Sequence, residues 1–269
     1  MKMLVPFLER MGEKSRGFFV EIAGLSRLFT HFFYWAFVAP ALGNRFGKSN
    51  SFGKQLLFVG NQSLGIVLLV GASVGAVLAL QAAYQLKQFG AVLYTGSLVS
   101  VSMMRELGPV ITAIVIAGRV GASVTAEIGT MKVSEEVDAL ITMGIPAIPF
   151  LVVPRILAIA IMLPCLTLLA DLIGIFGGFL IGTLSLAIDP HLYLQESLKA
   201  LVAKDVLTGL VKACVFAVLI GLISTFKGMS VEGGADGVGR ATTQSVVLSI
   251  VAIIFADCLL TALFYYVMS

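Results

Sequence analysis

The sequence predicts an all-α integral membrane protein. Of its 269 residues, 58% are hydrophobic and only 12% are charged, whereas soluble domains carry about 25% charged residues. The apolar runs are long and unbroken, and they lack the alternation of polar and apolar residues that marks the strands of an outer-membrane barrel. Because a helix satisfies its backbone hydrogen bonds internally, these runs are expected to cross the membrane as helices.

The first part of the chain, residues 1–50, is expected to contain a cytoplasmic N-terminus and an interfacial amphipathic helix that does not cross the membrane. Apolar residues recur at helical spacing from Gly17 to Ala39, with Glu21, Arg27 and His31 between them. This pattern closes with an aromatic run and is typical of an amphipathic helix in the membrane interface. The remaining residues, 51–269, are expected to form the membrane-spanning unit.

Five apolar segments of this unit are each long enough to cross a hydrocarbon layer of about 30 Å. They cover residues 56–83, 91–117, 150–186, 206–226 and 242–268. Gly71 and Gly75 in the first segment, and Gly174 and Gly178 in the third, leave small faces that allow close helix packing. The polar stretch between the third and fourth segments is expected to be a loop, as is the glycine-rich stretch 228–240.

The stretch from Arg119 to Pro146 is too polar to span and is expected to lie outside the membrane. Within it, residues 134–142 predict a short amphipathic helix, with Ser134 as N-cap and acidic side chains in the first turn. The apolar face of this helix is expected to carry Val137, Leu140 and Ile141. On spacing alone, a solvated connector and a docking element are equally good interpretations.

Two adjacent charges, Arg105 and Glu106, interrupt the apolar run of the second span. A charge at bilayer depth costs roughly 2.5–3.5 kcal/mol, which points to a function. Pro109 has no N–H to bond the Arg105 carbonyl, which predicts a helix kink at the charged pair. Neighbouring side chains point about 100° apart on a helix, so one charge can face a cavity while the other braces a helix. Alternatively, the two charges satisfy each other around the kink.

Lys212 in the fourth span and Asp257 in the fifth are predicted to form a structural ion pair between helices, because a lone charge at this depth would be costly. Asp171 in the third span is a further ionisable group. These groups are too few for a chain of proton sites, but they are enough to make a polar site in a cavity.

Several function classes find no support in the sequence. There is no phosphate-binding loop, no His/Cys cluster at metal-ligand spacing and no Ser/His/Asp set, so an enzyme and a metal site are not expected. No basic patch with interleaved aromatics suggests binding to nucleic acid. Transport fits the intramembrane charges best. One alternative is a proton-coupled secondary transporter that uses Glu106 or Asp257. Another is a structural anchor, but the intramembrane charges count against it, because a passive anchor would have no use for charges that are costly to place in the membrane.

The distribution of Lys and Arg predicts the orientation. With five spans the termini lie on opposite sides, and only Lys87, Lys199 and Lys204 fall on the side away from the N-terminus. The positive-inside rule therefore places the N-terminus and the 134–142 helix in the cytoplasm and the C-terminus outside.

Four motifs of this chain resemble one family, the MlaE/YrbE permeases. They are RELGP at 105–109, AGRVGAS at 117–123, AEIGTMKVSEEVDAL at 126–140 and GRATTQSVV at 239–247. Members of this family are the membrane subunits of ABC transporters associated with MCE proteins. The likeness extends from about Gly53 to the C-terminus.

The resemblance implies a homodimeric permease with an interfacial elbow helix and five spanning helices per subunit. It implies that residues 134–142 are the coupling helix that docks on a separate cytoplasmic ATPase, through Glu135, Glu136, Asp138 and Leu140. ATP and Mg would then be bound by that partner, with no cofactor in this chain. A small STAS-domain protein occurs in some such complexes.

The resemblance also implies a phospholipid cavity at the dimer interface, open toward an MCE-protein ring, with Arg105 and Glu106 beside it. Leu78 and Phe89 match positions near the cavity wall. The implied function is lipid movement between a bacterial inner membrane and the MCE carrier, which maintains the lipid asymmetry of the outer membrane. The transport direction, the lipid headgroup and the organism do not follow from the sequence.

Overall fold

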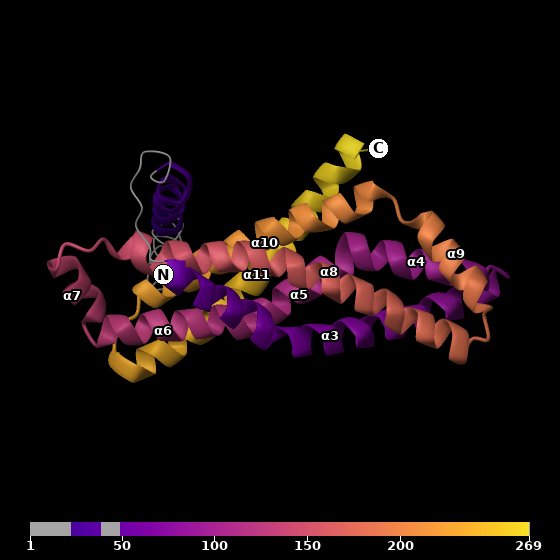
Figure 1. Cartoon of the computed structure of the whole chain (residues 1–269), viewed down its shortest axis with the longest axis horizontal. Coiled ribbons are helices and arrows are strands. Elements are labelled where there is room, and N and C mark those ends of the chain that lie inside the picture. Colours follow the sequence, from indigo (N-terminus) through magenta and orange to yellow (C-terminus); the bar gives the residue numbers. More distant parts are fainter. Residues whose placement is uncertain (1–22, 39–48, 269) are drawn as a thin grey trace, which may run out of the picture.

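The computed structural model describes residues 23–38 and 49–268, and every regular element in these ranges is helical. The long helices lie side by side in an elongated bundle (Figure 1). Five helices of the described residues are long and apolar enough to cross a membrane, namely Phe52–Gln88, Val92–Val133, Ile148–Leu184, Ala203–Met229 and Gly234–Tyr266. The predicted all-α class with five candidate spans is therefore confirmed.

The first span is longer than predicted. Helix α3 (Ser49–Gln88) continues through residues 84–88, which were expected to be a polar link. The chain then turns at Phe89 and Gly90, where the backbone of Gly90 takes a φ of +68° that favours glycine. A single 3₁₀ turn, η2 (Val92–Tyr94), leads into the second span.

The second span is one unbroken helical path that contains two π-helical turns. Its parts are α4 (Thr95–Ser102), η3 (Met103–Leu107), α5 (Gly108–Ile116), η4 (Ala117–Gly121) and α6 (Ala122–Val133). The helix continues beyond residue 117, the predicted end of the span, because the charge of Arg119 does not stop the helix. Its guanidinium is bonded to the first span instead, with Nη1 2.7 Å from Ser63 Oγ and Nη2 2.8 Å from Gln62 Oε1.

The predicted short helix is present as α7 (Glu136–Thr142), but it begins later than expected. Ser134 is not its N-cap. The Ser134 hydroxyl donates to the Thr130 carbonyl at 2.9 Å and so closes the end of α6. Glu135 then adopts a left-handed backbone with a φ of 61°, which redirects the chain into α7.

The third span begins with the π-helical turn η5 (Ile148–Val152) and continues as α8 (Val153–Leu184). The polar stretch that follows was expected to be a loop, but it contains helix α9 (Pro190–Ala200). Its N-cap is Asp189, whose Oδ1 accepts from the N–H groups of His191 at 2.9 Å and Leu192 at 3.1 Å. This N-cap stabilises α9, whose polar sequence was expected to form a loop.

The fourth and fifth spans are α10 (Ala203–Met229) and α11 (Gly234–Met268). The glycine-rich stretch between them was expected to be a flexible turn over 228–240. Only residues 230–233 lie outside these helices, because α11 already begins at Gly234. The sequence GRATTQSVV therefore lies on the first turns of α11.

Glycines set the distance between the first and third spans. A Cβ at Gly75 of α3 would overlap the backbone of Gly174 in α8, and a Cβ at Gly177 would overlap the carbonyl of Ala72. The close approach predicted from the small faces of these two helices is thus confirmed.

The two ends of the bundle differ. Helix α7 lies at one end together with the α10–α11 turn, and α9 lies at the opposite end (Figure 1). We call the first of these the α7 end. Residues 23–33 are helical and continue into a π-helical turn, η1 (Tyr34–Val38). Leu28 and Phe32 of this segment are buried against residues of η5, α8 and α10. Residues 17–22 and 39 of the predicted interfacial helix lie outside the described residues.

Candidate functional site

The charged pair of the second span lies on the π-helical turn η3, where the sequence predicted a kink. Pro109 has no N–H, and the N–H of Gly108 bonds the carbonyl of Met103, five residues back. The carbonyl of Met104 therefore accepts no hydrogen bond from the backbone of residue 108 or residue 109. Helix α10 approaches it at Gly209, where a Cβ would overlap that carbonyl. The proline and this glycine together bring the charged turn against the fourth span.

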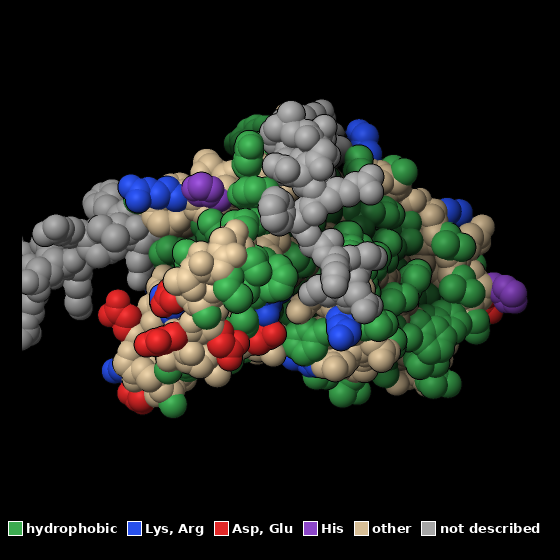
Figure 2. Space-filling model, turned by 60° about the vertical axis from the view of Figure 1, so that its left-hand side comes forward, with side chains coloured by type: hydrophobic (Ala, Val, Ile, Leu, Met, Phe, Trp, Pro, Cys, Tyr) green, Lys and Arg blue, Asp and Glu red, His purple; other side chains and the backbone are tan. Residues whose placement is uncertain are grey.

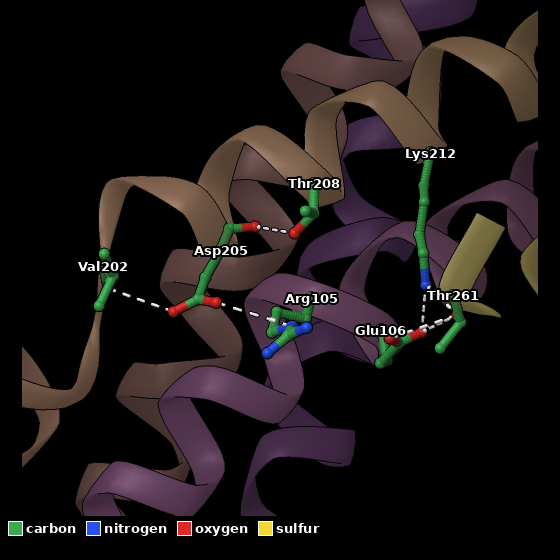
Figure 3. A network of polar contacts seen from close by, with 7 residues as sticks. All are labelled: Arg105, Glu106, Val202, Asp205, Thr208, Lys212 and Thr261. Atoms are coloured by element: carbon green, nitrogen blue, oxygen red, sulfur yellow. Dashed lines mark hydrogen bonds and ion pairs between the residues drawn. The ribbon is translucent and has the colours of Figure 1, made fainter. Parts of the chain in front are cut away.

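Glu106, Lys212, Asp257 and Thr261 form a polar network between the second, fourth and fifth spans, and Figure 3 shows Glu106, Lys212 and Thr261 of this network. The ammonium of Lys212, which is 1% exposed, pairs with Glu106 and with Asp257 Oδ1 at 2.8 Å. It also donates to Thr261 Oγ1 at 2.7 Å, and the Thr261 hydroxyl lies 3.2 Å from Glu106 Oε2. The structure thus brings Lys212 and Asp257 together and adds Glu106, which sequence reasoning had not placed beside them.

Arg105 has a different partner. Its Nε lies 3.6 Å from Asp205 Oδ1 at the start of α10, and Asp205 Oδ2 accepts from the N–H of Val202 at 3.2 Å (Figure 3). Arg105 and Glu106 therefore do not satisfy each other, because each has a partner on α10. Asp205 was missed in the sequence. Its position was the available signal. Asp205 is the third residue of α10, where an acidic side chain can accept a hydrogen bond from the N–H of the residue before the helix.

An apolar groove of 240 Å³ lies next to this turn. It is lined by Ser73, Val74, Val77, Leu78, Gln81 and Leu107. Leu107 belongs to the same π-helical turn as the charged pair, so the groove and the polar network are adjacent along the second span. Leu78 lines this groove. Phe89 does not line it, and its side chain is 81% exposed at the turn after α3.

The side chains of Arg105 and Glu106 are 43% and 37% exposed, so the network is open on one side. Only Glu106 separates Arg105, whose side chain is half-exposed, from Leu107 of the apolar groove, so a charged group and an apolar surface lie side by side on this turn. The described residues hold no group of three or more His, Cys, Asp or Glu side chains placed to bind a metal ion.

Asp171 does not join the network. Its side chain is 2% exposed and packs against Gly108, where a Cβ would overlap the carboxylate. Among the described residues it has no ion-pair partner.

A second candidate surface is the α7 end, which Figure 2 turns toward the viewer and which shows a gathering of acidic side chains. Glu135 and Glu136 are exposed there. Asp138 is also exposed, but it pairs with Lys132, whose Nζ lies 2.9 Å and 3.0 Å from its two oxygens. Leu140 packs inward in a cluster with Val137, Ala147 and Leu151.

The predicted apolar face of α7 is therefore only partly correct. Ile141 was placed on the inward face, yet it is 57% exposed, and Met143 after the helix is 65% exposed. Ile141 and Met143 therefore add two exposed apolar side chains to the acidic surface at the α7 end.

Comparison with known proteins gives consistent matches. A model of the family Permease MlaE matches residues 52–263. A probable ABC transporter permease protein of Rickettsia bellii is 46% identical over 214 residues, which cover 80% of this chain and 83% of the relative. The intermembrane phospholipid transport system permease protein MlaE of Haemophilus influenzae is 38% identical over 215 residues, 79% of this chain and 82% of the relative. The chain belongs to the MlaE permease family.

Proposed function

We propose that this chain is the permease subunit of an ATP-driven phospholipid transporter in a bacterial inner membrane. It acts as a homodimer with a separate cytoplasmic ATPase and passes lipid between the membrane and an MCE-protein carrier, and so maintains outer-membrane lipid asymmetry. The observation that carries the proposal is the charged π-helical turn η3 beside the apolar groove of Leu78 and Leu107. The relatives from Rickettsia and Haemophilus, which are named as permease proteins, support it.

The proposed site binds a phospholipid by its two chemical parts. The exposed side of Arg105 attracts the lipid phosphate, because a guanidinium forms bidentate hydrogen bonds to phosphate oxygens. An acyl chain occupies the groove, whose lining is mostly Val and Leu. Lys212 holds Glu106 toward α10 and keeps this carboxylate from competing with the lipid phosphate for Arg105.

ATP binding to the partner closes the ATPase dimer, and α7 receives this movement at the α7 end. The exposed Glu135 and Glu136, with Ile141 and Met143 beside them, are the proposed contact with the ATPase. Helix α6 leads from α7 back along the second span to η3, so displacement of α7 narrows the groove and drives the lipid toward the carrier. The ATPase end is then cytoplasmic, with the N-terminus on the same side and the C-terminus in the periplasm.

A proton-coupled mechanism through Glu106 or Asp257 receives no support from the geometry. Both carboxylates share Lys212 as a partner, which gives their charges a structural use. We therefore retain only the lipid-transport proposal.

The test is purification of the transporter from its native membrane in mild detergent, followed by mass spectrometry of co-purifying proteins and lipid. The proposal expects an ATPase, an MCE protein and stoichiometric phospholipid. The variant Arg105→Ala should keep the protein partners and lose the phospholipid and its transfer. The control is Lys199→Met, which breaks the exposed Lys199–Glu196 pair on α9. Full lipid retention and transfer by Arg105→Ala would remove the arginine from the site.

A further inference from the structure

One buried arginine at the α7 end has no role in the proposed lipid site. Arg155, near the start of α8, is 6% exposed at its side chain and pairs through Nη2 with Glu127 Oε1 of α6 at 2.8 Å. Its Nη1 donates to the carbonyl of Leu151, also at 2.8 Å. Glu127 belongs to the AEIGT motif that carries part of the family resemblance, yet neither the lipid site nor the α7 contact surface uses it.

This ion pair joins the two arms of the α6–α7–α8 hairpin. The arms share one neighbour, α10, and differ in the other, because α6 also lies against α11 whereas α8 also lies against α3. Helix α10 contacts α6 at Gly228, next to Ile128, and contacts α8 at Gly221, next to Ile156. In the part of the chain that the structure describes, Glu127–Arg155 is the one ion pair that bridges α6 and α8.

Both arms contain a π-helical turn close to the hairpin. In the second span it is η4, which precedes α6, and in the third it is η5, which precedes α8. π-helical turns are local irregularities at which a helix bends. Movement of α7 relative to the bundle can therefore be absorbed at η4 and η5 as a shear of one arm against the other.

We propose that Arg155 and Glu127 are positioning residues that clamp the two arms, so that movement of α7 reaches the charged turn η3 and is not lost at η4 and η5. The clamp rests on the proposed function, since it assumes that an ATPase moves α7. Arginine suits the task because its fork holds the Glu127 carboxylate and the Leu151 carbonyl at once, with two different nitrogens. The carboxylate is 51% exposed, so it can be altered without opening the core.

The experiment uses the complete transporter, purified with its ATPase and reconstituted with phospholipid vesicles and the carrier. Two rates are measured, ATP hydrolysis and lipid transfer, and their ratio is the readout. Glu127→Ala removes the carboxylate, and Glu127→Gln keeps an acceptor oxygen at the same distance from Arg155. Lys199→Met is the matched control, because it removes one partner of an ion pair on α9, at the opposite end of the bundle.

The clamp predicts that Glu127→Ala lowers lipid transferred per ATP by about tenfold, a typical allosteric coupling, while ATP hydrolysis stays within about twofold of the unaltered complex. Glu127→Gln should restore part of the ratio, and Lys199→Met should leave it unchanged. If the complex with Glu127→Ala does not assemble, Glu127→Gln tests the same prediction, because it should also lower the lipid transferred per ATP.

Two results would overturn the clamp while the proposed function stands. One is an unchanged ratio in both Glu127 variants. The other is a proportional fall of hydrolysis and transfer, which indicates a role in folding alone. Absence of any ATPase from the unaltered complex would instead refute the proposed function, and the clamp with it.

Discussion

Replacement of Lys212 by methionine tests the polar network most directly. The lysine side chain is 1% exposed and is the shared partner of Glu106 and Asp257, so Lys212→Met leaves two carboxylates without their cation. Removing one member of a buried ion pair costs about 3–5 kcal/mol. Because the carboxylate side chains are 37% and 23% exposed, water offsets part of this, and the lower end of about 3 kcal/mol applies here.

The assay is thermal unfolding of the purified protein in detergent. About 3 kcal/mol corresponds to a fall in the unfolding midpoint of about 6–12 °C, at about 2–4 °C for each kcal/mol in a domain of this size class. The control Lys199→Met breaks an exposed pair on α9 and should cost no more than about 1 kcal/mol.

A triple variant separates charge from packing. In Lys212→Met combined with Glu106→Gln and Asp257→Asn no unpaired charge remains, so the midpoint should recover to within about 4 °C of the unaltered protein. If the triple variant is as unstable as Lys212→Met alone, the loss comes from packing around the lysine stem and the electrostatic reasoning is wrong. An unchanged midpoint in Lys212→Met would refute it as well.

Two further predictions concern the first span. Gly75→Ala places a Cβ on the backbone of Gly174 and should cost about 1–3 kcal/mol through forced separation of the helices, measured as a lower unfolding midpoint. Gly65→Ala is its control, because no atom lies within 4 Å of the added Cβ, and it should be neutral or stabilising. Leu78→Trp narrows the 240 Å³ groove and should lower the phospholipid that co-purifies per chain, while the unfolding midpoint stays the same. Equal lipid in both proteins would exclude the groove as the acyl site.

The features that depend on composition and local spacing could be predicted from the sequence. Five apolar segments predicted five candidate spans, and the glycines at four-residue spacing predicted faces for close helix packing, which the structure pairs as a contact between the first and third spans. The features that could not be predicted depend on contacts between residues that are distant in the sequence. The charge of Arg119 predicts a break in the helix, since nothing local shows that Ser63 and Gln62 bond its guanidinium.

The candidate site divides in the same way. The cost of a lone charge inside the membrane predicted that Lys212 and Asp257 form a pair between helices, and the structure confirms this pair. No spacing rule links Glu106 to Lys212, because the two residues meet only when η3 packs against α10. Asp205 was overlooked because the fourth span was predicted to begin one residue after it.

The π-helical turns explain why spacing in the second span misleads. Each one inserts about one extra residue, which rotates the helix that follows by about 100° relative to a regular α-helix. Without η3 and η4, the face of α6 would be turned by about 200°. Thr125 would then face away from α11, although its Oγ1 lies 2.8 Å from the buried hydroxyl of Ser245. The same rotation sets the face on which Glu127 meets Arg155. The irregular turns, which no apolar pattern reveals, thus decide which surfaces of the second span contact the fourth, fifth and third spans.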